Sequence, residues 1–124
     1  MQRDPAASYK ELIVWKKSIE LAIAIYALTD RFPQAERYEI SSQMRRAAVS
    51  IPSNIAEGSR RTSHKEFRNF LCIAFGSGAE LETQITIAKR LPFGGKLDYQ
   101  LCDALLNEIM RMLNRMTNSL QVSD

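Results

Sequence analysis

Residues 45–58 read RRAAVSIPSNIAEG, an arginine pair followed by a helical pattern with a proline near its centre. Apolar residues recur at spacings of three and four when this segment is extended back to Glu36, which predicts a helix from about Glu36 to Gly58. Pro52 has no backbone N–H, and its ring clashes with the carbonyl oxygen of Ala48. We therefore expect this helix to be kinked near Pro52.

Three further segments carry the same helical periodicity. The first runs from residue 8 to 32 and the second from 63 to 90, and each begins with the Ser-x-x-Glu pattern of a capping box. The third runs from 97 to 120, after a turn at 91–95 that contains proline and glycine. No segment shows sustained alternation with the period of two that strands require. The sequence therefore predicts an all-α protein, an antiparallel up-down-up-down four-helix bundle.

The length of 124 residues suits one domain. We place a single four-helix-bundle domain at residues 8–121, with a disordered N-terminal tail at 1–7 and a C-terminal tail at 122–124. No apolar run approaches the roughly 20 residues of a membrane span, and the first residues lack the apolar centre of a signal peptide. We expect a cytoplasmic protein with no membrane contact, in which Cys72 and Cys102 are buried free thiols.

Two of the predicted helices carry more apolar residues than one buried face requires, because such a face is only a little wider than 100°. In the first helix, a second apolar row lies beside the row that runs through Trp15, Ile19 and Tyr26. The last helix has a similar addition. The extra rows have two interpretations, burial within the bundle or an interface between subunits of a homo-oligomer. The candidate interface residues are Val14, Leu21, Ile25, Leu28, Phe32, Leu106, Met110 and Leu113.

The segment 45–58 resembles part of the four-helix-bundle proteins encoded in 23S rRNA intervening sequences. Further motifs follow in the order that this family has them: YKELIVW at 9–15, KEF at 65–67, AELETQ at 79–84 and AKRL at 88–91. The resemblance implies a left-handed bundle that assembles into a ring, typically a homopentamer. It also implies an uncharacterised function, and it supplies no catalytic residues. A related bundle protein acts beside the reverse transcriptase of diversity-generating retroelements, which makes nucleic acid an expected partner.

Basic residues gather in the middle of the chain. Between Arg37 and Arg68, seven basic residues stand against three acidic ones, a net +4 where the whole chain has +3. Guanidinium groups match phosphate oxygens, and a helix N-terminus adds backbone N–H donors. The hypothesis is that the protein contacts RNA or DNA phosphates, with little readout of bases because no aromatic platform is evident. The candidate contact residues are Arg45, Arg46, Arg60, Arg61, Lys65 and Arg68.

Two alternatives to nucleic-acid binding stay open. In the first alternative, the basic residues form a solvated helical face, and Arg45 and Arg46 pair with Glu80 and Glu82. In the other, the protein is a ring that interacts only with itself or with other proteins. Salt-dependent binding separates these alternatives from contact with phosphates.

The sequence contains no catalytic constellation. Its only imidazole, His64, lies in a capping segment, whereas nucleophilic catalysis needs a base that a third group orients. Glu80 and Glu82 point about 200° apart around a helix, so they cannot face one site. We therefore expect no enzyme activity, no cofactor and no metal. The expected role is that of a non-catalytic scaffold or accessory factor.

Overall fold

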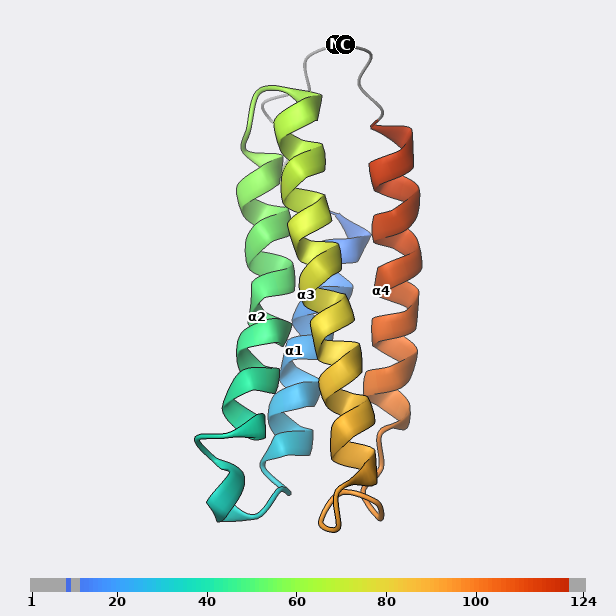
Figure 1. The fold of residues 1–124 in the computed structure, drawn as a ribbon. Helices are drawn as coiled ribbons and strands as arrows, with labels where there is room; N and C mark the ends of the chain where they lie inside the picture. Colours follow the sequence, from blue (N-terminus) through green and yellow to red (C-terminus); the bar gives the residue numbers. More distant parts are fainter. Residues whose placement is uncertain (1–8, 10–11, 121–124) are drawn as a thin grey trace.

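The computed structural model describes Tyr9 and residues 12–120. The predicted tails at 1–7 and 122–124, and the capping box that begins at Ser8, lie outside this part of the chain. Within it there are four long helices, one short 3₁₀ turn and no strand (Figure 1). In chain order, the elements are α1 Ile13–Thr29, η2 Gln34–Glu36, α2 Ile40–Ser59, α3 His64–Arg90 and α4 Gln100–Ser119.

The four helices form a bundle in which each helix packs against two neighbours. α1 contacts α2 and α4, and α3 contacts the same two helices from the other side. α3 and α4 run in opposite directions, because Arg68 near the start of α3 meets Thr117 near the end of α4, whereas Lys89 near the end of α3 meets Asp103 near the start of α4. The connection between α2 and α3 lies at one end of the bundle, and the other two connections lie at the opposite end (Figure 1). The predicted all-α four-helix fold is confirmed.

The row of α1 that was predicted to be a subunit interface lies in the core of a single chain. Its five members are all buried: Val14, Leu21, Ile25, Leu28 and Phe32. Ser18 belongs to the same row and has no exposed surface. Its hydroxyl donates a hydrogen bond to the carbonyl oxygen of Trp15 at 2.7 Å. In the neighbouring row, Trp15 and Ala22 are partly buried against the core, whereas Tyr26 is exposed.

The extra residues of α4 are also used inside one chain. Leu106 and Leu113 are buried, and Met110 is half-buried because it packs against Gly78 of α3. Leu101, in the first turn of α4, is by contrast 64% exposed. Side chains that one chain already covers cannot cover a second chain. Of the two interpretations of these rows, the structure of one chain therefore supports burial within the bundle and not a subunit interface.

α2 passes through Pro52 as one continuous helix, so the proline does not break it. Two side chains near it make hydrogen bonds to backbone carbonyl oxygens one turn earlier: the Ser53 hydroxyl donates to Val49 and the Asn54 amide donates to Ser50, both at 2.8 Å. These bonds lie next to the carbonyl of Ala48, which has lost its donor to the proline. The kink near Pro52 stays a prediction.

Gly58 does not end α2, because the helix continues to Ser59. The glycine is buried where α2 meets α3, and a Cβ built on it would lie 2.5 Å from the Cβ of Phe70. No glycine in the described part of the chain has a positive φ. Gly58 therefore serves the close approach of two helices and not a left-handed helix end.

Both cysteines are free, but only Cys102 is buried, so the prediction that Cys72 is buried is wrong. Among the described residues, none of the helices combines the length and the apolar character needed to cross a membrane. No three His, Cys, Asp or Glu side chains gather to hold a metal ion in the same part of the chain.

Candidate nucleic-acid interface

The six basic residues predicted to contact phosphates fall into two groups at opposite ends of α2. Arg45 and Arg46 lie near its start, whereas the other four surround the connection to α3. Arg60 lies fourteen positions after Arg46 and caps the end of α2, which at 1.5 Å per residue places the two about 21 Å apart. Closeness in the sequence therefore does not produce one basic patch.

The group at the α2–α3 connection is positioned by a helix cap. Ser63 accepts a hydrogen bond from the backbone N–H of Glu66 at 3.1 Å, as its capping box predicted, and α3 begins at the next residue. Arg60 and Lys65 are exposed on either side of this cap. The Arg60 guanidinium carbon lies 5.2 Å from the ring centroid of Tyr9. Neither Arg60 nor Lys65 has an acidic partner among the residues described.

The other two members of this group make contacts within the bundle. An Arg61 nitrogen lies 3.3 Å from a carboxylate oxygen of Glu57, and its guanidinium carbon lies 4.9 Å from the ring centroid of Phe70. Arg68 donates from Nε to the carbonyl oxygen of Thr117 at 3.0 Å, which satisfies a backbone acceptor in the last turn of α4. Arg61 and Arg68 are therefore already engaged in contacts within the bundle.

At the other end of α2, Arg45 is held in place. Its Nε donates to the Thr29 hydroxyl and its Nη2 to the Asp30 carboxylate, both at 2.8 Å. The guanidinium carbon also lies 4.4 Å from the ring centroid of Tyr26. The predicted pairing of Arg45 with Glu80 or Glu82 is therefore wrong. Arg46 is exposed and has no ion pair within the described residues, so it does not pair with either glutamate.

Arg45 and Arg46 line a surface hollow of about 500 Å³ together with residues that the sequence analysis did not select as candidates. These are Arg37 and Tyr38 from the connection after η2 and Tyr26 from α1. Arg37 and Tyr38 are neighbours in the sequence, and this pairing of a basic with an aromatic residue was a local signal that could have indicated the site. Tyr26 gave no such signal, because only the packing of α1 on α2 brings it there.

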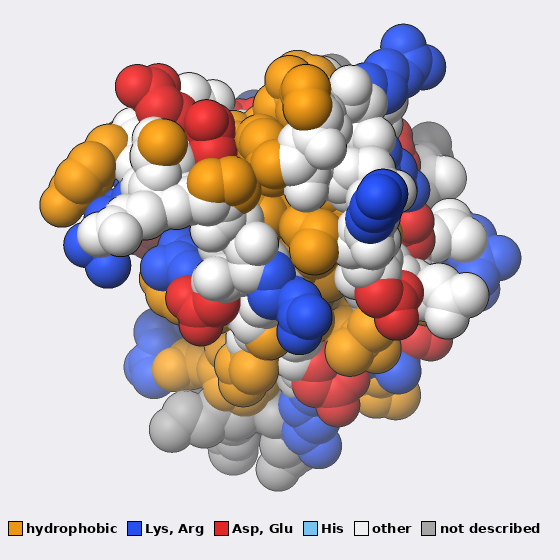
Figure 2. All heavy atoms as spheres, turned by 90° about the horizontal axis from the view of Figure 1, so that it is seen from below, with side chains coloured by type: hydrophobic (Ala, Val, Ile, Leu, Met, Phe, Trp, Pro, Cys, Tyr) orange, Lys and Arg blue, Asp and Glu red, His pale blue; other side chains and the backbone are white. Residues whose placement is uncertain are grey.

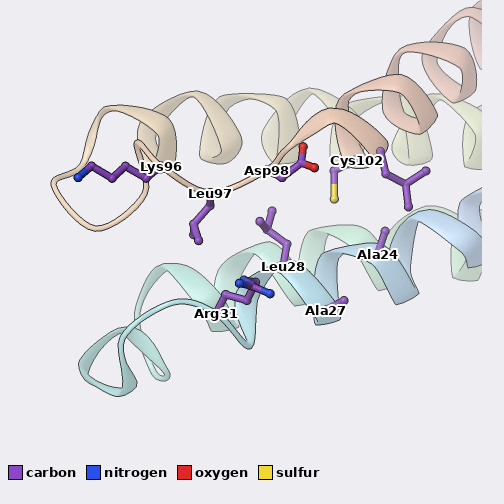
Figure 3. Close-up of a pocket in the computed structure, with 9 residues that line it drawn as sticks. Ala24, Ala27, Leu28, Arg31, Lys96, Leu97, Asp98 and Cys102 are labelled. Atoms are coloured by element: carbon purple, nitrogen blue, oxygen red, sulfur yellow. The ribbon is translucent and has the colours of Figure 1, made fainter.

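A second hollow, of about 450 Å³, lies between α1 and the α3–α4 connection (Figure 3). Arg31 and Lys96 lie at its edge with the carboxylate of Asp98, and Cys102 lies on the α4 side. Burial, more than the nearby Asp103, raises the pKa of the Cys102 thiol to about 11. The thiol is therefore protonated at neutral pH and is a weak nucleophile.

The end of the bundle that carries both hollows is not uniformly basic. Figure 2 shows this end, with blue basic, red acidic and orange hydrophobic side chains interleaved over it. Unpaired cations therefore matter more here than net charge, since a paired cation is already neutralised by its partner. Of the six predicted contact residues, Arg46 at this end and Arg60 and Lys65 at the opposite end have no acidic partner among the residues described. Arg45 and Arg61 do have one.

Comparison with known proteins identifies the relatives of this chain. The family model described as 23S rRNA-intervening sequence protein matches residues 10–115. Among solved structures, a protein of unknown function from the S23 ribosomal protein family of Bacteroides thetaiotaomicron is similar, with a TM-score of 0.68 and 22% sequence identity. The match covers 89% of this chain and 100% of that chain, and at this identity it concerns the fold alone. No curated protein matches the sequence.

Proposed function

This chain belongs to the 23S rRNA-intervening sequence protein family, and we propose that it is a non-catalytic, cytoplasmic accessory factor that contacts the phosphates of RNA or DNA. The function of the family is uncharacterised, so the proposal depends on the surface of this chain. The rRNA in the family's name is consistent with a nucleic-acid partner. No cofactor or metal enters the proposal, and the contacts are made by side chains alone.

Three exposed cations without acidic partners carry the proposal: Arg46, Arg60 and Lys65. Arg60 caps α2 fourteen positions after Arg46, and this spacing is about 40° short of four full helical turns, so the two residues lie on the same outward side of the helix. Lys65 follows in the first turn of α3. This surface presents charges that a phosphate backbone would neutralise at several points at once. Such contacts release counterions, which makes binding strongly dependent on salt.

The test is the affinity for a fluorescently labelled RNA duplex, measured by anisotropy at several salt concentrations. The double variant Arg60→Ala with Lys65→Ala should lower the affinity and reduce the slope of log affinity against log salt by up to about 2. A matched control is Arg111→Ala with Arg115→Ala, which removes two exposed cations from α4. It should change the slope by less than half as much. Arg61 is unsuitable as a test because it is paired with Glu57.

Two results would overturn the proposal. One is the absence of binding to duplex and single-stranded RNA and DNA even at low salt. The other is an equal effect of the two double variants, since that would assign binding to overall charge and not to this surface.

We also propose that the protein is a homo-oligomer, which the family resemblance suggests to be a pentameric ring. The support is exposed apolar surface on α1, where Ile13 is 61% and Ile23 is 66% exposed. These residues replace the buried rows as candidates for the interface. The same observation favours the second candidate function, a ring that interacts only with itself or other proteins.

Light scattering tests the assembly. Ile23→Glu should reduce the mass of the assembly, because a charge would be buried in the interface, whereas Ile73→Glu on the exposed side of α3 should not. A native protein with the mass of one chain at micromolar concentration would contradict the oligomer. An oligomer that binds no nucleic acid would establish the second candidate function instead.

A further inference from the structure

The hollow between α1 and the start of α2 has the size and the lining of a binding site. Its volume of about 500 Å³ lies within the range of sites for small molecules. The residues that line it include Arg37, Arg45 and Arg46, the aromatic residues Tyr26 and Tyr38, and Ser42, and none of them is acidic. A ligand with both an anionic group and a flat ring would match these side chains.

The three arginines of the hollow have different roles. Arg45 is anchored by Asp30 and Thr29 and lies over the ring of Tyr26, so it forms a fixed part of the wall. Arg37 and Arg46 are exposed and have no ion pair among the described residues. Two cations are therefore available to an incoming anion. Guanidinium groups bind phosphate oxygens through pairs of parallel hydrogen bonds.

The aromatic rings provide the second half of the site. Tyr38 is 84% exposed and Tyr26 is 44% exposed, and both line the same hollow as the free arginines. One side of the Tyr26 ring is covered by Arg45. Tyr38 makes no ring contact with any other described residue, which leaves its faces open. A nucleic-acid base stacks on such a ring, and this stacking tolerates any base.

We propose that this hollow binds one unpaired nucleotide of a single-stranded nucleic acid, with its base stacked on Tyr38 and its phosphate between Arg37 and Arg46. A base within a duplex has both faces covered by its neighbours, so only an unpaired base can make this contact. The inference rests on the proposed function and specifies its ligand. It also adds base contact to a surface for which the sequence predicted backbone contact alone.

The test compares a labelled single-stranded oligoribonucleotide with the duplex of the same sequence. Tyr38→Ala should weaken binding of the single strand about tenfold and leave binding of the duplex unchanged. Tyr38→Phe keeps the ring and should restore the affinity. Ile73→Ala is the matched control, because it also truncates an exposed hydrophobic side chain but lies on α3. For the phosphate contact, Arg46→Ala should weaken single-strand binding more than Arg111→Ala, which removes the same charge from α4.

The outcomes separate this inference from the proposed function. If Tyr38→Ala leaves single-strand affinity unchanged while Arg60→Ala with Lys65→Ala weakens duplex binding, the inference fails and the proposed function stands. Equal weakening of single strand and duplex by Tyr38→Ala also overturns the inference. If neither form binds at low salt, both fail.

Discussion

Replacing Gly58 by alanine should destabilise the protein, although alanine is the better helix former. A Cβ at this position would lie 2.5 Å from the Cβ of Phe70 and 3.1 Å from a ring carbon of Phe67. It would also lie 3.3 Å from the Phe67 carbonyl oxygen. Carbon atoms in contact are about 3.5–4.0 Å apart, so α2 and α3 would have to separate by about 1 Å. The first obstacle is a Cβ fixed to its own backbone, and no rotamer change can move it away.

The magnitude follows from two opposing effects. Overpacking a closely packed site costs about 1–3 kcal/mol, and the higher helix propensity of alanine returns up to about 1 kcal/mol. We therefore expect Gly58→Ala to lower the free energy of unfolding by about 1–2 kcal/mol. Gly76→Ala is the internal control, because a Cβ there would meet no atom within 4 Å. That variant should raise the free energy of unfolding by up to about 1 kcal/mol.

Thermal unfolding followed by circular dichroism measures both variants at one protein concentration. A shift of roughly 3–6 °C per kcal/mol is expected for a chain of this size, downward for Gly58→Ala and upward for Gly76→Ala. If Gly58→Ala unfolds at or above the temperature of the wild type, α2 and α3 do not approach as closely as described. The reasoning about this glycine would then be wrong.

Four other predictions concern thiol reactivity, titration and polar contacts. At pH 8 a thiol reagent should modify Cys72 in the folded protein and reach Cys102 only on unfolding, as counted by absorbance, because burial raises the pKa of Cys102 to about 11. This value lies above the pKa of 9.0 of an unperturbed thiol, so the stability that neutral Cys102 contributes is complete below pH 9 and is lost as the pH rises to about 11. Cys102→Ala should therefore flatten this part of a plot of the free energy of unfolding against pH. Tyr99→Phe should cost about 1 kcal/mol in urea unfolding, because the buried Tyr99 hydroxyl donates to a loop carbonyl oxygen at 3.0 Å. Arg45→Ala should cost about 1 kcal/mol by the same measurement, because it removes a donor from Thr29 together with a partly exposed ion pair.

The sequence could predict the helices because the signals that define them are local. Periodicity identified all four, and the Ser63 cap placed the start of α3 correctly. The buried face of α1 was one of the two rows that the apolar pattern identified, and Ser18 lies within it. Its hydroxyl bonds to a carbonyl of its own helix, so burying it costs little, and a pattern of apolar residues cannot register this.

The candidate site was less predictable because it depends on distance in space. Arg46 and Arg60 are close in the sequence, but the helix between them keeps them apart. Arg45 and Arg46 have equal charge in the sequence, yet only Arg45 meets a carboxylate, and that carboxylate belongs to the end of α1. Tyr26 and Tyr38 come together only through the packing of α1 on α2. Periodicity contains no information about such contacts.

α2 keeps Arg46 and Arg60, neither of which has an acidic partner among the described residues, at a nearly fixed distance from each other. At 3.4 Å per base pair, the distance of about 21 Å between Arg46 and Arg60 corresponds to about six steps of a DNA duplex. Because a hydrogen-bonded helix neither stretches nor shortens appreciably, only a partner at least this long can engage both arginines at once. A DNA duplex shorter than this would therefore reach only one of the two arginines.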